Sequence, residues 1–170
     1  MCLKSIGIKN IDIDTYINFM TELSNYFYEQ KTSEITQNSL KSFISSYKEE
    51  YNLNIKEEYL LENLLQVRLL RKDSLGMYAF YYPYIFYYFM GKYLSENLKK
   101  SKHKIEDIMN NLHLEKNSYI CIFLIHHNKD DDIMDDIKLN AMCLFDDMEP
   151  STLFIEELNF FNTEQNPIIL

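Results

Sequence analysis

Apolar residues recur every three or four positions along the first part of the chain, which predicts three amphipathic helices. The predicted helices are Thr15 to about Tyr28 with Asp14 as N-cap, a second helix begun by a Thr36 cap, and Lys56 to about Gln66. The side chains expected to face inward are Tyr16, Phe19, Met20, Leu23, Phe27, Leu40, Phe43, Ile44, Tyr47, Tyr59, Leu60, Leu64 and Leu65.

A β-hairpin is predicted after the third helix. Its first strand is Val67-Arg68-Leu69-Leu70, its turn is Asp73-Ser74-Leu75-Gly76, and its second strand is Met77 to Tyr82. Three helices followed by a two-stranded wing form the winged-helix plan. The first part of the chain is therefore predicted to be a winged-helix-like unit.

The segment from Met77 to Leu94 is the densest aromatic stretch, because ten of its eighteen residues are Tyr or Phe. Pro83 divides it, and proline suits the first turn of a helix, where its missing N–H needs no partner. A strand is thus expected to pass directly into a helix spanning residues 83–100. A membrane span is the rival interpretation, but the uncharged part is short, rich in tyrosine and interrupted by proline.

The second half is predicted to be entirely helical. After the aromatic helix we expect helices at Lys104–Leu112, Ser118 to about His127, Asp130 to about Asp146 and Pro150–Phe160, then a frayed tail over Asn162–Leu170. Residues 1–82 would form the winged-helix-like unit and 83–170 a helical bundle, with the aromatic helix packing against both. The fold class is mainly α.

Composition supports this class and narrows the function. Three glycines and three prolines in 170 residues leave little room for a turn-rich β fold. The net charge of −9 argues against a nucleic-acid-binding surface, and Glu57, Glu58 and Glu62 on the third helix would repel phosphates. The wing carries Arg68, Arg71 and Lys72, so a winged-helix DNA-binding regulator stays as an alternative.

The basic run Lys99-Lys100-Ser101-Lys102-His103-Lys104 lies where a helix is expected to end. Cations there complement the helix dipole, which favours a solvated linker over a phosphate site. The cysteines Cys2, Cys121 and Cys143 show no metal or disulfide spacing, and the last two lie in apolar helical patterns. A reducing cytoplasm is the expected location, since the N-terminus also lacks a signal-peptide pattern.

Two clusters could carry chemistry, and both have simpler interpretations. His126 and His127 with the acids Asp130, Asp131, Asp132, Asp135 and Asp136 could bind a divalent metal, but a helix ending at the histidines and an Asp130 cap explain the same residues. Cys121 or Cys143 could pair with either histidine as a nucleophile and base. Core packing is favoured, because an apolar setting raises a thiol pKa.

A family resemblance rests on the run Phe80-x-Tyr82-x-x-Ile85-x-Tyr87-Tyr88-Phe89-x-Gly91-Lys92-Tyr93-Leu94. It resembles the strand-to-helix junction in the winged-helix domain of STAND-type (NACHT-like) P-loop NTPases, a group that includes many bacterial anti-phage defence proteins. The segments Ile120–Asp130 and Ala141–Asp146 are similar to helices that follow this junction in bacterial members. The resemblance extends over roughly Asp14 to Phe160.

The resemblance implies a regulatory role without catalysis. Such a region acts as a lever that packs on the nucleotide domain and swings during assembly, and its partner would be a P-loop NTPase domain in cis or in trans. The chain contains no Gly-x-x-x-x-Gly-Lys-Ser/Thr run, so we expect no ATPase activity and no cofactor of its own. Tyr82 stands where the family carries a nucleotide-sensing histidine, and it can donate a hydrogen bond but cannot carry positive charge.

The residues expected at the junction or at an interface are Phe80, Tyr82, Pro83, Tyr84, Tyr87, Tyr88 and Tyr93. A stand-alone acidic helical adaptor or immunity-type protein, with no link to a nucleotide, is the second interpretation. We expect protein contacts in both cases, with neither nucleic acid nor membrane as the partner.

Overall fold

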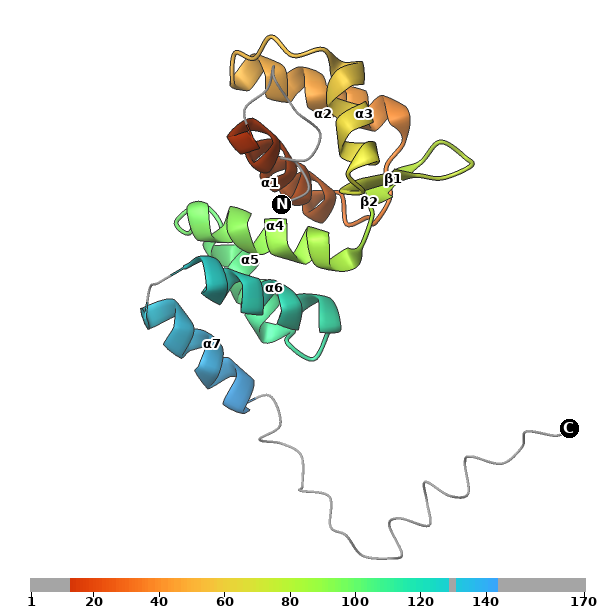
Figure 1. Cartoon of the computed structure of the whole chain (residues 1–170). Helices are drawn as coiled ribbons and strands as arrows, with labels where there is room; N and C mark the ends of the chain where they lie inside the picture. The colour runs from red at the N-terminus through yellow and green to blue at the C-terminus, as the bar shows by residue number, and fades with distance from the viewer. Residues whose placement is uncertain (1–12, 129–130, 144–170) are drawn as a thin grey trace, which may run out of the picture.

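The computed structural model describes residues 13–128 and 131–143 (Figure 1). Within these ranges the elements are α1 (Ile13–Glu29), α2 (Gln37–Glu50), α3 (Glu57–Gln66), β1 (Leu70–Lys72), β2 (Tyr78–Phe80), α4 (Pro83–Glu96), α5 (Lys102–Asn110), α6 (Glu115–His127) and α7 (Asp131–Cys143). The fold is mainly helical, with a winged-helix-like unit followed by further helices, as predicted. The expected helix at Pro150–Phe160 and the tail lie outside the described residues.

The hairpin follows α3 as predicted, but its first strand begins three residues later than expected. β1 and β2 pair antiparallel, with Leu70 opposite Phe80 and Lys72 opposite Tyr78. Val67 instead caps the C-terminus of α3, and Arg68 takes a positive φ of 58°, so the chain cannot be extended there. Ile35 forms an isolated β-bridge with Tyr78. The Ile35 N–H donates to the Tyr78 carbonyl with an N···O distance of 2.9 Å, and the Tyr78 N–H donates to the Ile35 carbonyl at 2.8 Å.

The predicted helix boundaries are partly right. Thr36 caps α2, because its hydroxyl accepts a 3.1 Å hydrogen bond from the Ser39 N–H. Asp14 lies inside the first turn of α1 and is not its N-cap, although an acid there still complements the dipole. α4 ends at Glu96 instead of residue 100, and α5 and α6 each begin earlier than expected.

The inward faces of the first three helices were predicted almost completely. All five expected side chains of α1 are buried, as are Leu40, Ile44 and Tyr47 of α2. Leu61 of α3, which was not predicted to face inward, is buried. The prediction is wrong for Tyr59, which was expected to face inward but is 37% exposed. A tyrosine tolerates this position because its hydroxyl stays in water.

Two apolar clusters meet on α4. The first joins α1, α2, α3 and the hairpin and reaches α4 at Phe89, and the second joins α4 with α5, α6 and α7 through Met90 and Leu94. Phe86 packs against both clusters. Figure 1 shows α4 lying between the layer of α1 to α3 and the layer of α5 and α6. The division of the chain into units 1–82 and 83–170 stays a prediction.

Charged and polar side chains also tie α1 directly to α5. Lys104 donates to Asn25 Oδ1 at 2.7 Å and forms an ion pair with Glu29. The Tyr28 hydroxyl donates to Asp107 Oδ2 at 3.4 Å. The second layer is therefore held to α1 by these contacts as well as through α4.

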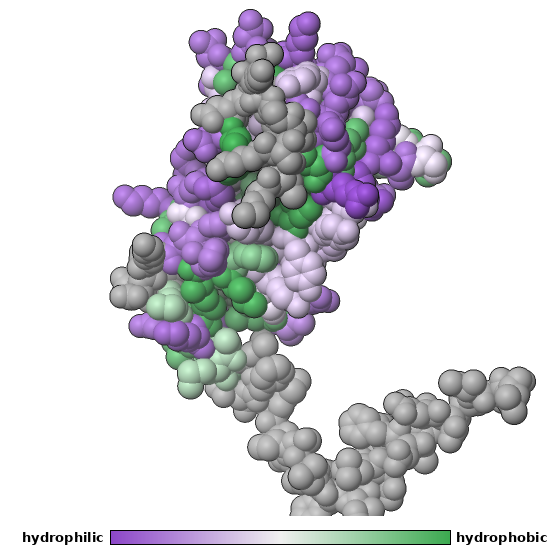
Figure 2. All heavy atoms as spheres, in the orientation of Figure 1, coloured by the Kyte–Doolittle hydropathy of each residue, from purple (hydrophilic) through white to green (hydrophobic). Residues whose placement is uncertain are grey.

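The surface differs between the two layers. Figure 2 shows hydrophilic residues over the outer surface of α2 and α3, hydrophobic residues between the helices of this layer, and a further hydrophobic area over α5 to α7. Ile122, Leu139 and Met142 are 56%, 60% and 76% exposed. Cys143 is exposed, which corrects its predicted place in an apolar core. None of the helices in the described ranges is long and apolar enough to cross a bilayer.

Gly91 permits the close approach of α4 and α6. A Cβ at this position would lie 2.7 Å from Phe123 Cβ and 2.8 Å from the Leu124 backbone nitrogen. Two of the three nearest atoms belong to the backbone, so no rotamer change can relieve the overlap. The small residue sets the distance between the two helices.

We predict that Gly91→Ala lowers the free energy of unfolding by at least about 1–3 kcal/mol, because the added methyl group forces α4 and α6 apart. Denaturant unfolding followed by circular dichroism measures this loss. Lys92→Ala is the control on the same helix, since it removes a surface ion pair with Glu96 and should stay within about 1 kcal/mol of wild type. Equal stabilities for the two variants would contradict the close-packing account.

Candidate functional site

The first candidate site is a tyrosine surface formed by Tyr84, Tyr87 and Tyr119, whose rings contact one another, and by the exposed Tyr82 at the N-cap of α4. The Tyr84 ring lies 4.9 Å from that of Tyr119, and Tyr87 stacks on Tyr119 at 5.6 Å with an interplanar angle of 5°. Tyr82 and Tyr84 are 55% and 50% exposed. Three tyrosines from the start of α4 and one from α6 thus form a partly exposed aromatic surface.

Tyr82 lies at the N-terminus of α4 as its N-cap residue, with extended backbone angles. Its ring contacts Tyr81 edge to face at 4.7 Å. Pro83 occupies the first turn of α4, as the sequence predicts. The position of Tyr82 leaves its hydroxyl available to a partner, and whether it contacts a nucleotide stays a prediction.

The other junction residues divide into buried and exposed groups. Phe80 is buried, and its ring contacts Phe27 at 5.1 Å and Phe86 at 5.5 Å. Tyr88 is 37% exposed and lies against His127 at 4.6 Å. Tyr93 lies under the Lys104 ammonium at 5.4 Å. These contacts connect α4 to the hairpin, to α6 and to α5.

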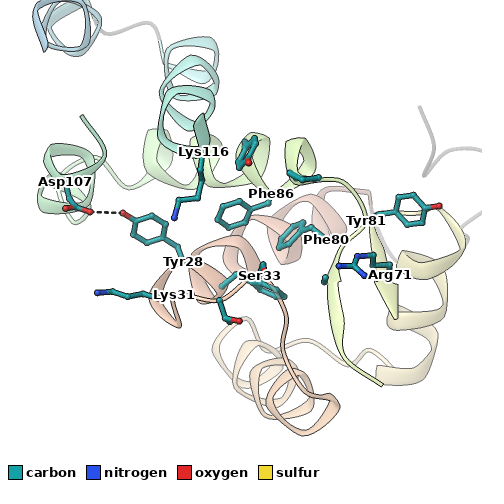
Figure 3. Close-up of a pocket in the computed structure, with 14 residues that line it drawn as sticks. Tyr28, Lys31, Ser33, Arg71, Phe80, Tyr81, Phe86, Asp107 and Lys116 are labelled. Carbon is teal, nitrogen blue, oxygen red and sulfur yellow. Dashed lines mark hydrogen bonds between the residues drawn. The ribbon is translucent and has the colours of Figure 1, made fainter. Parts of the chain in front are cut away.

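The second candidate site is a pocket of about 670 Å³ between α1, β2, α4, α5 and α6. Its lining residues are Phe27, Tyr28, Lys31, Thr32, Ser33, Arg71, Ala79, Phe80, Tyr81, Pro83, Phe86, Tyr87, Asp107 and Lys116. Figure 3 shows Lys31 and Lys116 beside Tyr28 at one end, Arg71 and Tyr81 at the other, and Phe80 and Phe86 between them. The volume is in the range of small-molecule sites.

The electrostatics of this pocket differ from those of the whole acidic chain. Three cations and one carboxylate line it, although Glu34 neutralises Arg71 through a 2.8 Å ion pair. Burial, followed by the charge of Asp107, raises the pKa of Tyr28 to about 12. Tyr28 therefore keeps its proton well above physiological pH, and its hydroxyl donates a hydrogen bond to Asp107.

The predicted metal and nucleophile candidates do not form a site in the described part of the chain. His126 is exposed and His127 half-buried, with their ring centroids 5.3 Å apart, whereas Asp130 lies outside the described residues. No group of three or more His, Cys, Asp or Glu residues suited to a metal occurs in the ranges 13–128 and 131–143. Burial raises the pKa of Cys121 to about 12, which keeps its thiol protonated.

The basic run is divided between the predicted linker and a helix. Lys99 and Lys100 lie exposed between α4 and α5, as expected of a solvated linker. Lys102 and Lys104 belong to the first turn of α5, so they do not complement the C-terminus of α4. Lys104 instead holds α5 to Asn25 and Glu29 of α1. Part of the run thus has a structural role.

Sequence reasoning missed the pocket. Its charged residues come from the turn after α1, from β1, from α5 and from the start of α6, and no local pattern indicates that they converge. Only Arg71 had been singled out, as a basic residue of the wing. The aromatic run, which does stand out in the sequence, contributes the Phe80 and Phe86 side chains to the lining.

A comparison with protein families gives one match. Residues 33–90 match the family model described as Novel STAND NTPase 4. The match begins after α1 and ends within α4, so it includes α2, α3, the hairpin and the tyrosines at the start of α4. Residues 33–90 are therefore related to a STAND NTPase family, and the predicted resemblance outside this stretch stays a prediction.

No curated protein and no solved structure gives a significant match to the chain.

We predict that stability falls as the pH rises from about 10 to about 12. Burial raises the pKa of Tyr28 and of Tyr47 to about 12 from the usual 10.0, so the folded state retains their protons longer than the unfolded state. Their contribution is complete below pH 10 and is lost as the pH passes the folded pKa. Thermal unfolding at fixed ionic strength measures the decline.

Substitution by phenylalanine distinguishes the contribution of Tyr28 and Tyr47 to this alkaline decline from that of the other tyrosines. Tyr28→Phe and Tyr47→Phe should each make the alkaline decline of the melting temperature shallower, because neither ring can ionise. Tyr82→Phe, at an exposed position, is the matched control. A decline that is the same in all four proteins would contradict the assignment.

Proposed function

We propose that this chain is a non-catalytic regulatory module that couples conformational change to assembly in a STAND-type NTPase system, with a role in anti-phage defence. Its partner is a P-loop NTPase domain, supplied either in the same polypeptide or by a second one. The observation that carries the proposal is the match over residues 33–90 together with the place of α4 in both apolar clusters.

The packing of α4 suits a lever. It is a 14-residue helix, about 21 Å long, whose two sides are buried against α1 and α6. The close contact at Gly91 leaves no space for α6 to slide on α4. A displacement of the second layer would therefore move α4 and the winged-helix-like unit with it.

The tyrosine surface supplies a contact for the partner. Tyr82, Tyr84 and Tyr87 belong to the STAND-related stretch and stand at the start of the lever helix. Tyrosine is among the residues that dominate protein interfaces, since a ring can be buried while its hydroxyl forms a hydrogen bond. The charge of −9 on the chain favours a partner face that carries cations.

The lack of catalysis in this proposal follows from the sequence and from the site chemistry. The chain has no phosphate-cradling Gly-x-x-x-x-Gly-Lys run. The buried Cys121 thiol is held protonated, which makes it a poor nucleophile. Any ATP hydrolysis would come from the partner, and the contribution of Tyr82 would be a single hydrogen bond.

We predict that the tagged full chain captures a P-loop NTPase from an extract of its own host cells. Tyr82→Ala and Tyr84→Ala should reduce this capture, because they remove exposed rings without opening the core. Tyr59→Ala removes an exposed ring from α3 and serves as the control for specific loss. Quantitative mass spectrometry of the captured proteins gives the measurement.

Three outcomes would contradict the proposal. Capture that contains no P-loop NTPase would favour the acidic adaptor or immunity-type protein. If the NTPase were captured equally well by Tyr82→Ala, Tyr84→Ala and Tyr59→Ala, the tyrosine surface would not be the binding site. Tight binding of duplex DNA at physiological salt would favour the DNA-binding regulator, despite the exposed Glu58 and Glu62 on α3.

A further inference from the structure

The lysines at one end of the pocket have no carboxylate partner among the described residues. The ion pairs of that part of the chain include Arg71 with Glu34, but neither Lys31 nor Lys116. Lys116 lies over the Tyr28 ring at 5.6 Å, and Asp107 is occupied by the Tyr28 hydroxyl. Asp107 keeps its negative charge in that hydrogen bond, so two ammonium groups and one carboxylate leave an excess of positive charge at this end, in a chain with a net charge of −9.

The middle of the pocket is apolar and aromatic. Phe80 contacts Phe27 and Phe86 edge to face, at 5.1 and 5.5 Å between ring centroids. Ala79 and Pro83 extend this lining without adding a side-chain hydrogen-bonding group. A flat apolar body placed here would gain both from burial and from contact with ring edges.

The neutral state of Tyr28 keeps the lysine end positive. A phenol of ordinary pKa is already neutral at physiological pH, and burial, followed by Asp107, raises the pKa of Tyr28 further, to about 12, so no phenolate offsets the lysines. The single carboxylate of Asp107 faces two lysines and the paired Arg71 on the same lining. The lysine end therefore favours an anionic group.

We propose that this pocket binds a small aromatic anion, with its acidic group beside Lys31 and Lys116 and its ring against Phe80 and Phe86. Carboxylates, sulfonates and phosphate monoesters on an aromatic body share this chemistry. A volume of about 670 Å³ is enough for such a molecule and far larger than an inorganic ion. The proposal is independent of the function proposed above, because it needs no NTPase partner.

The probe for this site is 1-anilinonaphthalene-8-sulfonate, an aromatic sulfonate whose fluorescence rises in an apolar setting. The full chain should bind it saturably, and 1-naphthoate should displace it at about three- to tenfold lower concentration than the neutral 1-naphthylmethanol. Inorganic phosphate should displace it least, since it cannot use the aromatic lining. No saturable binding, or equal displacement by naphthoate and naphthylmethanol, would overturn the proposal.

Charge-removing variants locate the binding. Lys31→Gln and Lys116→Gln should each lower the affinity for the sulfonate probe about three- to tenfold. Thermal unfolding checks that both variants stay folded. Lys41→Gln makes the same charge change at an exposed position of α2 outside the pocket, and it should bind as wild type does. Equal affinities in all three variants would place the probe elsewhere and overturn the proposal.

Discussion

The close contact between Gly91 of α4 and the backbone of α6 is the constraint on which the arrangement of the two layers depends. It brings the helices near enough for Met90 and Leu94 to enter a cluster with Ile120 and Leu124, all four of which are fully buried. On the opposite side, α4 packs against α1, and Phe86 contacts both clusters. A single helix is thus a core element of both layers, as expected of a helix that carries apolar residues on more than one face.

Both candidate sites depend on this placement of α4. Its first turn carries Tyr82 and Tyr84 to the surface, and the stacking of Tyr87 on Tyr119 requires α6 to lie alongside. The pocket opens where the end of α1 and the start of α6 flank α4, so Lys31 and Lys116 converge only if the two layers keep their relative position. Because α4 carries part of both sites and packs closely against α6, a displacement of the two layers as one body would move the tyrosine surface and the pocket together.

The sequence predicted the parts of the fold that depend on local patterns. Apolar spacing identified the buried face of α1, the Thr36 hydroxyl signalled the start of α2, and Pro83 marked the change from strand to helix. The wrong boundaries occur where backbone conformation or tertiary contacts, and not local sequence patterns, determine where an element begins. The positive φ of Arg68 delays β1, and α5 begins at Lys102, before the predicted start at Lys104, whose ammonium is held by Asn25 and Glu29 of α1. The pocket could not be predicted, since its lysines are distant in sequence and follow no periodic pattern.

Native-state hydrogen exchange tests most directly whether α4 joins the two layers into one cooperative unit. The account predicts that amides in the middle of α4, around Met90, exchange only through global unfolding, with the same free energy as the slowest amides of α1 and α6. It further predicts that Gly91→Ala lowers these three free energies by the same amount. If the amides of α5 and α6 opened at a free energy several kcal/mol lower while α1 stayed protected, the layers would be independent and the account would be contradicted.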